Sequence, residues 1–129
     1  MKINKNIVVT AAILGAVTIM IGAFGAHGLK DLIDEKSLVS FETGVRYQMY
    51  HVFALLILGF ATAISLNTQK WVFRFFIFGI LFFSGSIYLL TLNQFLPLDA
   101  KTFAFITPIG GLLLIIGWLR LAYGVIVNK

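Results

Sequence analysis

Four long runs rich in apolar residues constrain this chain more than any other feature of its sequence. They cover residues 7–26, 45–66, 71–92 and 103–127, and the first run has no charged residue. A helix needs about 20 apolar residues to cross the hydrocarbon core of a bilayer, which is about 30 Å thick. The runs do not alternate with a period of two, as the strands of a membrane barrel would. We therefore predict a single all-α domain, an integral membrane four-helix bundle.

The composition also favours lipid as the solvent. Hydrophobic residues make up 60% of the 129 residues, whereas soluble domains contain about 45–50%. A soluble domain of this length buries only part of its surface, so it would expose much of this excess to water. The first run is longer than the roughly 7–15 apolar residues of a signal peptide, so we expect a helix that stays in the protein.

Basic residues indicate topology rather than a nucleic-acid partner. The net charge is +5, but the ten Lys and Arg residues lie near the ends of the apolar runs and do not form a basic face. Six of them fall on one side of the predicted membrane and four on the other, which favours cytoplasmic termini. All five acidic residues then lie outside, namely Asp31, Asp34, Glu35, Glu42 and Asp99.

The predicted connections between the helices differ in kind. Leu29, Leu32 and Ile33 follow a helical spacing with charged residues between them, which predicts a short amphipathic helix on the outer membrane surface. Ser37 is the expected N-cap of the second long helix. Residues 67–70 (Asn-Thr-Gln-Lys) predict a tight polar turn, so the second and third helices are expected to be antiparallel neighbours.

Small residues follow one face of the first run. Helices in lipid associate by close packing, and small side chains let their backbones approach. We interpret this stripe as packing within the chain's own bundle, with a homo-oligomer contact or a pore-lining face as alternatives. The full set of expected packing residues is Ala11, Gly15, Thr18, Gly22, Gly25, Ala26, Gly28, Gly44, Ser84, Gly85 and Ser86.

Two motifs flank the predicted outer connection, GAFGAHGLK at residues 22–30 and FETGVRYQMYH at residues 41–51. Glu42 and Arg46 are spaced i, i+4 with the acid first, which is the favourable order on a helix. We predict that polar side chains of both motifs form one cluster at the outer end of the bundle. Its expected members are His27, Glu42, Arg46, Tyr47, Tyr50 and His51.

The sequence does not offer a set of catalytic residues. It has no cysteine, and no Asp, Glu or Lys lies in the middle of an apolar run, where ion-coupled transporters usually carry an ionisable group. Two histidines without a third ligand are a poor metal site and a weak haem signal. We therefore predict no enzymatic activity, no metal and no cofactor.

The two motifs together resemble those of a family of small bacterial inner-membrane proteins of the YgdD and YwdK type. The family's eukaryotic relatives include a small mitochondrial transmembrane protein. The resemblance covers nearly the whole chain, and residues 110–118 are similar to the family's last helix. It implies a multi-pass protein of the bacterial plasma membrane with four helices. The family is classed by an uncharacterised domain, so the resemblance implies no activity and no ligand residues.

Three hypotheses for function follow. The first is a non-enzymatic membrane protein that binds a protein partner, a lipid or another copy of itself through the outer junction of the first two helices. The second is a small oligomeric channel or transporter. The third is a haem- or quinone-linked redox protein that uses His27 and His51.

Reporter fusions test the predicted orientation. Fusions at Asn67 and Lys129 are expected to report the cytoplasm, and a fusion near Lys36 the outside, because basic residues are retained on the cytoplasmic side. Paired fusions to alkaline phosphatase and to a cytoplasmic fluorescent protein make the measurement. The reverse pattern would overturn the assignment of every residue to its side.

Overall fold

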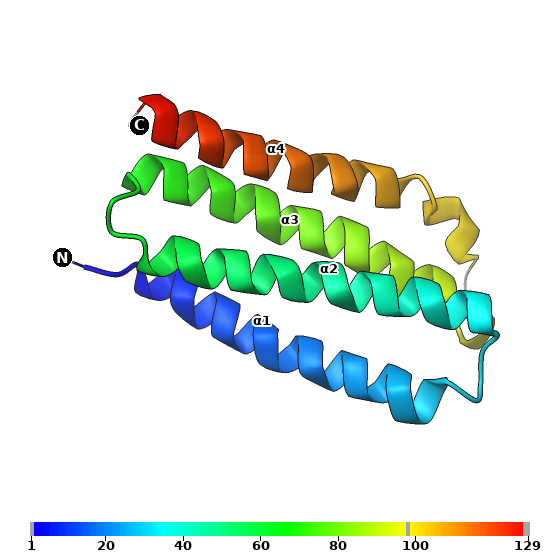
Figure 1. Cartoon of the computed structure of the whole chain (residues 1–129). Helices are drawn as coiled ribbons and strands as arrows, with labels where there is room; N and C mark the ends of the chain where they lie inside the picture. The colour runs from blue at the N-terminus through cyan, green and yellow to red at the C-terminus, as the bar shows by residue number, and fades with distance from the viewer. Residues whose placement is uncertain (1, 98, 128–129) are drawn as a thin grey trace.

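The computed structural model (Figure 1) describes residues 2–97 and 99–127. Four long helices dominate it, and the described residues contain no strand. The all-α prediction and the four-helix bundle are therefore confirmed. The long helices are α1 (Lys5–Ala23), α2 (Glu35–Phe60), α3 (Leu66–Thr91) and α4 (Ile106–Val127), and the short ones are η1 (Phe24–Leu29), η2 (Asn93–Phe95) and η3 (Ala100–Phe103).

Neighbours in sequence are neighbours in space. Extensive contacts join α1 to α2, α2 to α3 and α3 to α4, and Figure 1 shows α1 and α4 at opposite edges with α2 and α3 between them. The start of α1 and the end of α4 lie at the same end of the molecule. Each helix thus runs antiparallel to the next.

Three helical segments are long and apolar enough to cross a membrane, namely Lys5–Leu29, Leu66–Thr91 and Lys101–Val127. The first half of α2 carries charged residues, and α2 does not meet the same criterion. However, α2 has 26 residues, as many as α3, and it packs against both α1 and α3. It therefore follows the same path through the bundle as the two helices beside it.

The turn between α2 and α3 lies at residues 61–65, so the prediction of a turn at residues 67–70 was wrong. Ser65 caps α3 by accepting a hydrogen bond from the backbone N–H of Thr68 at 3.2 Å. Gln69 is buried, and its Nε2 donates to the carbonyls of Leu58 at 2.8 Å and Ala61 at 3.2 Å. The last carbonyls of a helix have no partner within that helix. The polar residues expected in the turn are instead inside α3, where Gln69 satisfies the end of α2.

The start of α2 also differs from the prediction. Its N-cap is Asp34 rather than Ser37, and Asp34 Oδ1 accepts from the backbone N–H of Ser37 at 2.7 Å. This hydrogen bond lowers the pKa of the Asp34 carboxyl below its usual value, since it favours the ionised form. Residues 30–33 form turns instead of the short helix expected there. An ionised acid is a strong N-cap and suits the positive end of a helix, so α2 begins directly after Asp34.

One apolar core joins all four long helices. Large side chains on the outer faces of α1 and α4 are exposed, as a lipid environment requires. The core residues are Ile7, Ala11, Leu55, Leu58, Val72, Phe76, Ile80 and Leu114.

Glycines bring α4 close to α3. A Cβ atom on Gly117 would lie 2.6 Å from the ring of Phe76, and one on Gly110 would overlap the backbone N of Phe83. Gly110 and Gly117 are seven residues apart, so both face α3. This contact differs from the stripe on α1 because at Gly110 the neighbour is backbone, which cannot move aside as a side chain can.

Alanine at Gly110 tests this close contact. Gly110→Ala is expected to destabilise the protein by roughly 1–3 kcal/mol, because α3 and α4 must move apart to admit the methyl group. Gly85 on α3 is the control, since a Cβ there would meet no heavy atom within 4 Å. Gly85→Ala is expected to be neutral or stabilising by up to about 1 kcal/mol. Unfolding in mixed micelles gives both values, and equal stability of the two variants would contradict the prediction.

Candidate functional site

The two sequence motifs meet where α1 ends. The π-helix η1 continues α1, and π-helical turns are frequent at functional sites. A Cβ atom on Gly25 would lie 2.7 Å from the ring of Phe41, and one on Gly22 would lie 3.3 Å from Val45. The glycines of the first motif therefore allow η1 to lie directly against the second motif on α2.

A crevice of about 240 Å³ opens between η1 and α2. Glu42 and Arg46 both line it, and both are exposed. Arg46 Nη2 donates to Thr43 Oγ1 at 3.2 Å, and among the described residues no salt bridge joins Arg46 to Glu42. The crevice thus presents a carboxylate and a guanidinium beside a small apolar surface. Its lining residues are Gly22, Gly25, Ala26, Phe41, Glu42, Val45 and Arg46.

The other polar residues predicted for this cluster lie apart from the crevice. His27 is exposed on η1 and is not among the residues that line it. The ring of Tyr47 packs against the rings of Phe83 on α3 and of Tyr50, with 5.1 Å and 5.7 Å between the ring centroids. The structure therefore places Glu42 and Arg46 at the crevice, Tyr47 and Tyr50 in an aromatic group beside α3, and His27 on the exposed surface of η1.

His51 is buried, about 24 Å along α2 from its first residue. Its Nδ1 donates to the carbonyl of Tyr47 at 2.7 Å, and its Nε2 accepts from the indole N–H of Trp118 at 3.0 Å. An indole nitrogen only donates, so Nε2 carries no proton and the ring is neutral. Both ring nitrogens are already bonded, and the structure does not bring His27 and His51 together at one ligand position.

Sequence reasoning missed Gln48, which organises the polar interior. Gln48 is buried; its Nε2 donates to Thr18 Oγ1 at 2.7 Å, and its Oε1 accepts from the hydroxyl of Tyr88 at 2.7 Å. Thr18 in turn donates to the carbonyl of Leu14 at 2.6 Å. This chain of hydrogen bonds joins α1, α2 and α3. The available signal was the helical spacing of Gly44, Gln48 and His51, which places all three on one face of α2.

Most of the small residues on α1 face α2 within the same chain. Ala11 and Thr18 are fully buried, and a Cβ atom on Gly15 would lie 3.2 Å from Val52. Ala26 lies at the crevice, and a Cβ atom on Gly28 would be nearest to Phe24 of the same helical turn.

The small polar residues of α3 contact two neighbouring helices. Ser84 Oγ donates to the carbonyl of Gly44 on α2 at 2.7 Å. Ser86 Oγ is hydrogen-bonded to Thr107 Oγ1 on α4. Gly85, between them, faces open space. Ser84 and Ser86 thus bond to helices on the two sides of α3.

Comparison with known proteins places the chain in a family. A family model described as a protein of unknown function, DUF423, matches residues 21–111. This range includes both motifs and every residue that lines the crevice. The chain belongs to this family. The match includes Gln48 and Tyr88 but not Thr18, and it ends at residue 111, so it leaves out most of α4.

Relatives in three bacterial genera extend the similarity over most of the chain. A UPF0382 membrane protein of Staphylococcus saprophyticus is 45% identical over 116 residues, covering 87% of this chain and 92% of that protein. YwdK of Bacillus subtilis is 37% identical over 122 residues, covering 91% and 93%. The inner membrane protein YgdD of Escherichia coli is 34% identical over 126 residues, covering 95% and 91%. No solved structure matches the chain.

The comparisons confirm the resemblance drawn from the two motifs. The relatives are named membrane or inner membrane proteins, and three segments of this chain can cross a membrane. The chain is therefore a multi-pass protein of the bacterial plasma membrane.

A double-mutant cycle tests the hydrogen bond between Tyr88 and Gln48. Tyr88→Phe is expected to cost about 1 kcal/mol of stability, because Gln48 loses the donor to its Oε1. Combined with Gln48→Met, it should give a coupling energy of about 0.6 kcal/mol, the average for such bonds in membranes. Tyr50→Phe is the control, since Tyr50 is exposed and its change should be neutral. Additive effects of Tyr88→Phe and Gln48→Met in micelle unfolding would contradict the assignment.

Proposed function

We propose that this chain is a non-enzymatic membrane protein that binds a zwitterionic phospholipid with a primary ammonium headgroup at the α1–α2 junction. The observation that carries the proposal is the exposed pair of Glu42 and Arg46 beside the crevice. The two residues are one helical turn apart, with about 5–6 Å between their Cβ atoms. This spacing suits a headgroup in which a phosphate and an ammonium lie next to each other.

Arg46 supplies the phosphate contact in this proposal. A guanidinium has five N–H donors in a rigid fork and binds phosphate through two of them. Arg46 directs Nη2 to the hydroxyl of Thr43 at 3.2 Å, which fixes the side chain and leaves other donors for a ligand. The hydrogen bond thus supports an arginine that is positioned before a headgroup arrives.

Glu42 supplies the preference for an ammonium headgroup. An ethanolamine ammonium can donate hydrogen bonds to the carboxylate, whereas the quaternary ammonium of choline has no N–H to donate. A purely anionic headgroup would be repelled by the same carboxylate. The carboxylate therefore favours phosphatidylethanolamine over both phosphatidylcholine and phosphatidylglycerol.

The apolar side of the crevice suits an acyl chain. Gly22, Gly25 and Ala26 form the α1 and η1 side of the crevice. Gly22 and Gly25 already contact Val45 and Phe41, so an acyl chain would lie along the outer rim of the crevice, beside the exposed Ala26. Phe41 and Val45 form the facing wall on α2. The crevice combines this apolar surface with charged groups at one place, as a phospholipid does.

The interior of the bundle supports a binding role rather than chemistry. Thr18, Gln48 and Tyr88 are hydrogen-bonded to one another, and His51 is bonded at both ring nitrogens. These bonds give the buried polar groups a packing role. Glu42 and Arg46, in contrast, are exposed at the junction, where a ligand can reach them.

Lipid binding to the purified full-length protein tests the proposal. Native mass spectrometry of protein in detergent with added phosphatidylethanolamine or phosphatidylcholine measures the two affinities. Arg46→Gln is expected to weaken both by about fivefold, corresponding to about 1 kcal/mol for a basic residue near a lipid surface. Glu42→Gln is expected to remove the preference for ethanolamine while binding of choline lipid stays unchanged.

Glu35→Gln with Lys36→Gln is the matched control, because both residues are exposed on α2 and lie outside the crevice. This variant should keep the wild-type preference. Equal affinity of the wild type for the two lipids would contradict the proposal. So would a crosslinked second copy or another membrane protein at the junction whose contact is lost in Glu42→Gln, since the pair would then serve a protein partner.

A further inference from the structure

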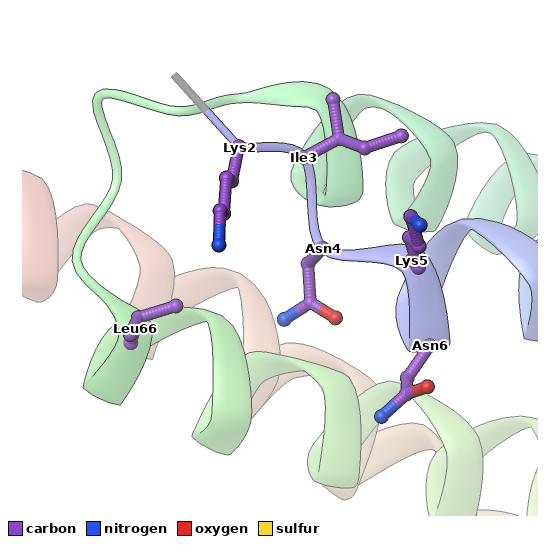
Figure 2. A pocket seen from close by; sticks show the side chains of 6 residues that line it. All are labelled: Lys2, Ile3, Asn4, Lys5, Asn6 and Leu66. Carbon is purple, nitrogen blue, oxygen red and sulfur yellow. The ribbon is translucent and has the colours of Figure 1, made fainter.

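A second hollow lies at the opposite end of the molecule, where α1 begins (Figure 2). Its volume is about 810 Å³, and it opens between the chain before α1 and the start of α3. Figure 2 shows the side chains of Lys2 and Asn4 directed toward the start of α3, where Leu66 lies. The lining residues are Lys2, Ile3, Asn4, Lys5, Asn6 and Leu66.

The backbone that carries these lysines is held in place. The backbone N–H of Asn4 donates to the carbonyl of Gly59 at 2.8 Å. The Asn4 side chain accepts from the backbone N–H of Ile7 at 3.3 Å and donates to Gln69 Oε1 at 3.4 Å. The segment before α1 is thus tied to the end of α2 and to α3. Lys2 and Lys5 therefore extend from a fixed backbone into or beside the hollow.

The acidic residues of the described chain are confined to one end of the molecule. They lie at the far end, from Asp31 to Glu42 and at Asp99, together with four basic residues, Lys30, Lys36, Arg46 and Lys101. The end with the hollow has basic residues and no acid among the described residues. Lys70, Arg74 and Arg120 lie in the parts of α3 and α4 nearest the hollow. Nearby cations without nearby acids raise the local concentration of anions. The hollow is therefore a favourable place for a negatively charged group.

We propose that this hollow binds the phosphate diester of an anionic phospholipid. The ammonium groups of Lys2 and Lys5 would neutralise the phosphate, and the amide of Asn6 would donate to one of its oxygens. Ile3 and Leu66 are exposed apolar side chains at the same hollow, and they would contact the start of the acyl chains. Two lysines without an acid select a net negative headgroup, whereas the Glu42–Arg46 crevice selects a zwitterion. The two sites share no residue, so either can fail without the other.

Affinity for three ligands tests the site and separates a lipid from free phosphate. Microscale thermophoresis of the full-length protein in detergent is measured with phosphatidylglycerol, phosphatidylcholine and inorganic phosphate. The wild type is expected to bind phosphatidylglycerol more tightly than the other two. Lys2→Gln with Lys5→Gln is expected to weaken phosphatidylglycerol binding about 25-fold, at about fivefold for each lysine near the surface.

Lys70→Gln with Arg74→Gln is the matched control, because it removes the same charge from exposed residues at the same end that do not line the hollow. It should weaken phosphatidylglycerol less than the lysine pair does. Equal losses in the two double variants would overturn the site in favour of a diffuse charge effect. Equal affinity for inorganic phosphate and phosphatidylglycerol would overturn the lipid as the ligand.

Asn6→Asp distinguishes binding from folding. Asn6 lies in the first turn of α1, where an acid stabilises a helix, so this variant should fold at least as well as the wild type. The same carboxylate would face the lipid phosphate, and phosphatidylglycerol affinity should fall at least as much as in Lys5→Gln alone. Unchanged affinity in Asn6→Asp would overturn the placement of the phosphate beside α1.

Discussion

The side chain of Gln48 is the interaction on which the arrangement of the first three helices depends. In lipid, no water is available to replace a lost hydrogen bond, so a buried amide must find all its partners within the protein. Gln48 finds one on α1 and one on α3, which fixes how far each helix can slide along α2. The same hydrogen bond to α1 fixes the position of Glu42 and Arg46 relative to η1, because both residues are on the same helix as Gln48.

Small residues serve different purposes on the two outer helices. On α1 they make room for side chains of α2, such as Val45 and Val52. On α4, Gly110 brings backbone against backbone, and α3 and α4 form the most extensive contact in the molecule. The bundle is therefore a tight α3–α4 pair, to which α2 and then α1 are added through side-chain packing and the hydrogen bonds of Gln48.

The helices could be predicted from the sequence because long apolar runs have few other structures in lipid. Their ends could not, because polar residues near a run act either as turn residues or as caps of the neighbouring helix. Gln69 and Asp34 show this, since each satisfies backbone groups whose position depends on the fold. At the candidate site, the helical spacing of Glu42 and Arg46 predicted their common side of α2. It did not predict that His51 faces Trp118, because that contact depends on how α4 packs against α3.

The charged residues at both ends bear on how the protein remains in the membrane after insertion. To turn over, the molecule would have to move the acids with Lys30, Lys36, Arg46 and Lys101 one way, and the lysines and arginines near the hollow the other way, all through hydrocarbon. Each such charge costs at least about 2.5 kcal/mol at the bilayer centre, and several would cross together. Such a barrier makes inversion negligible on the lifetime of a cell. The orientation adopted during synthesis is therefore permanent. The crevice stays at one leaflet of the membrane and the hollow at the other.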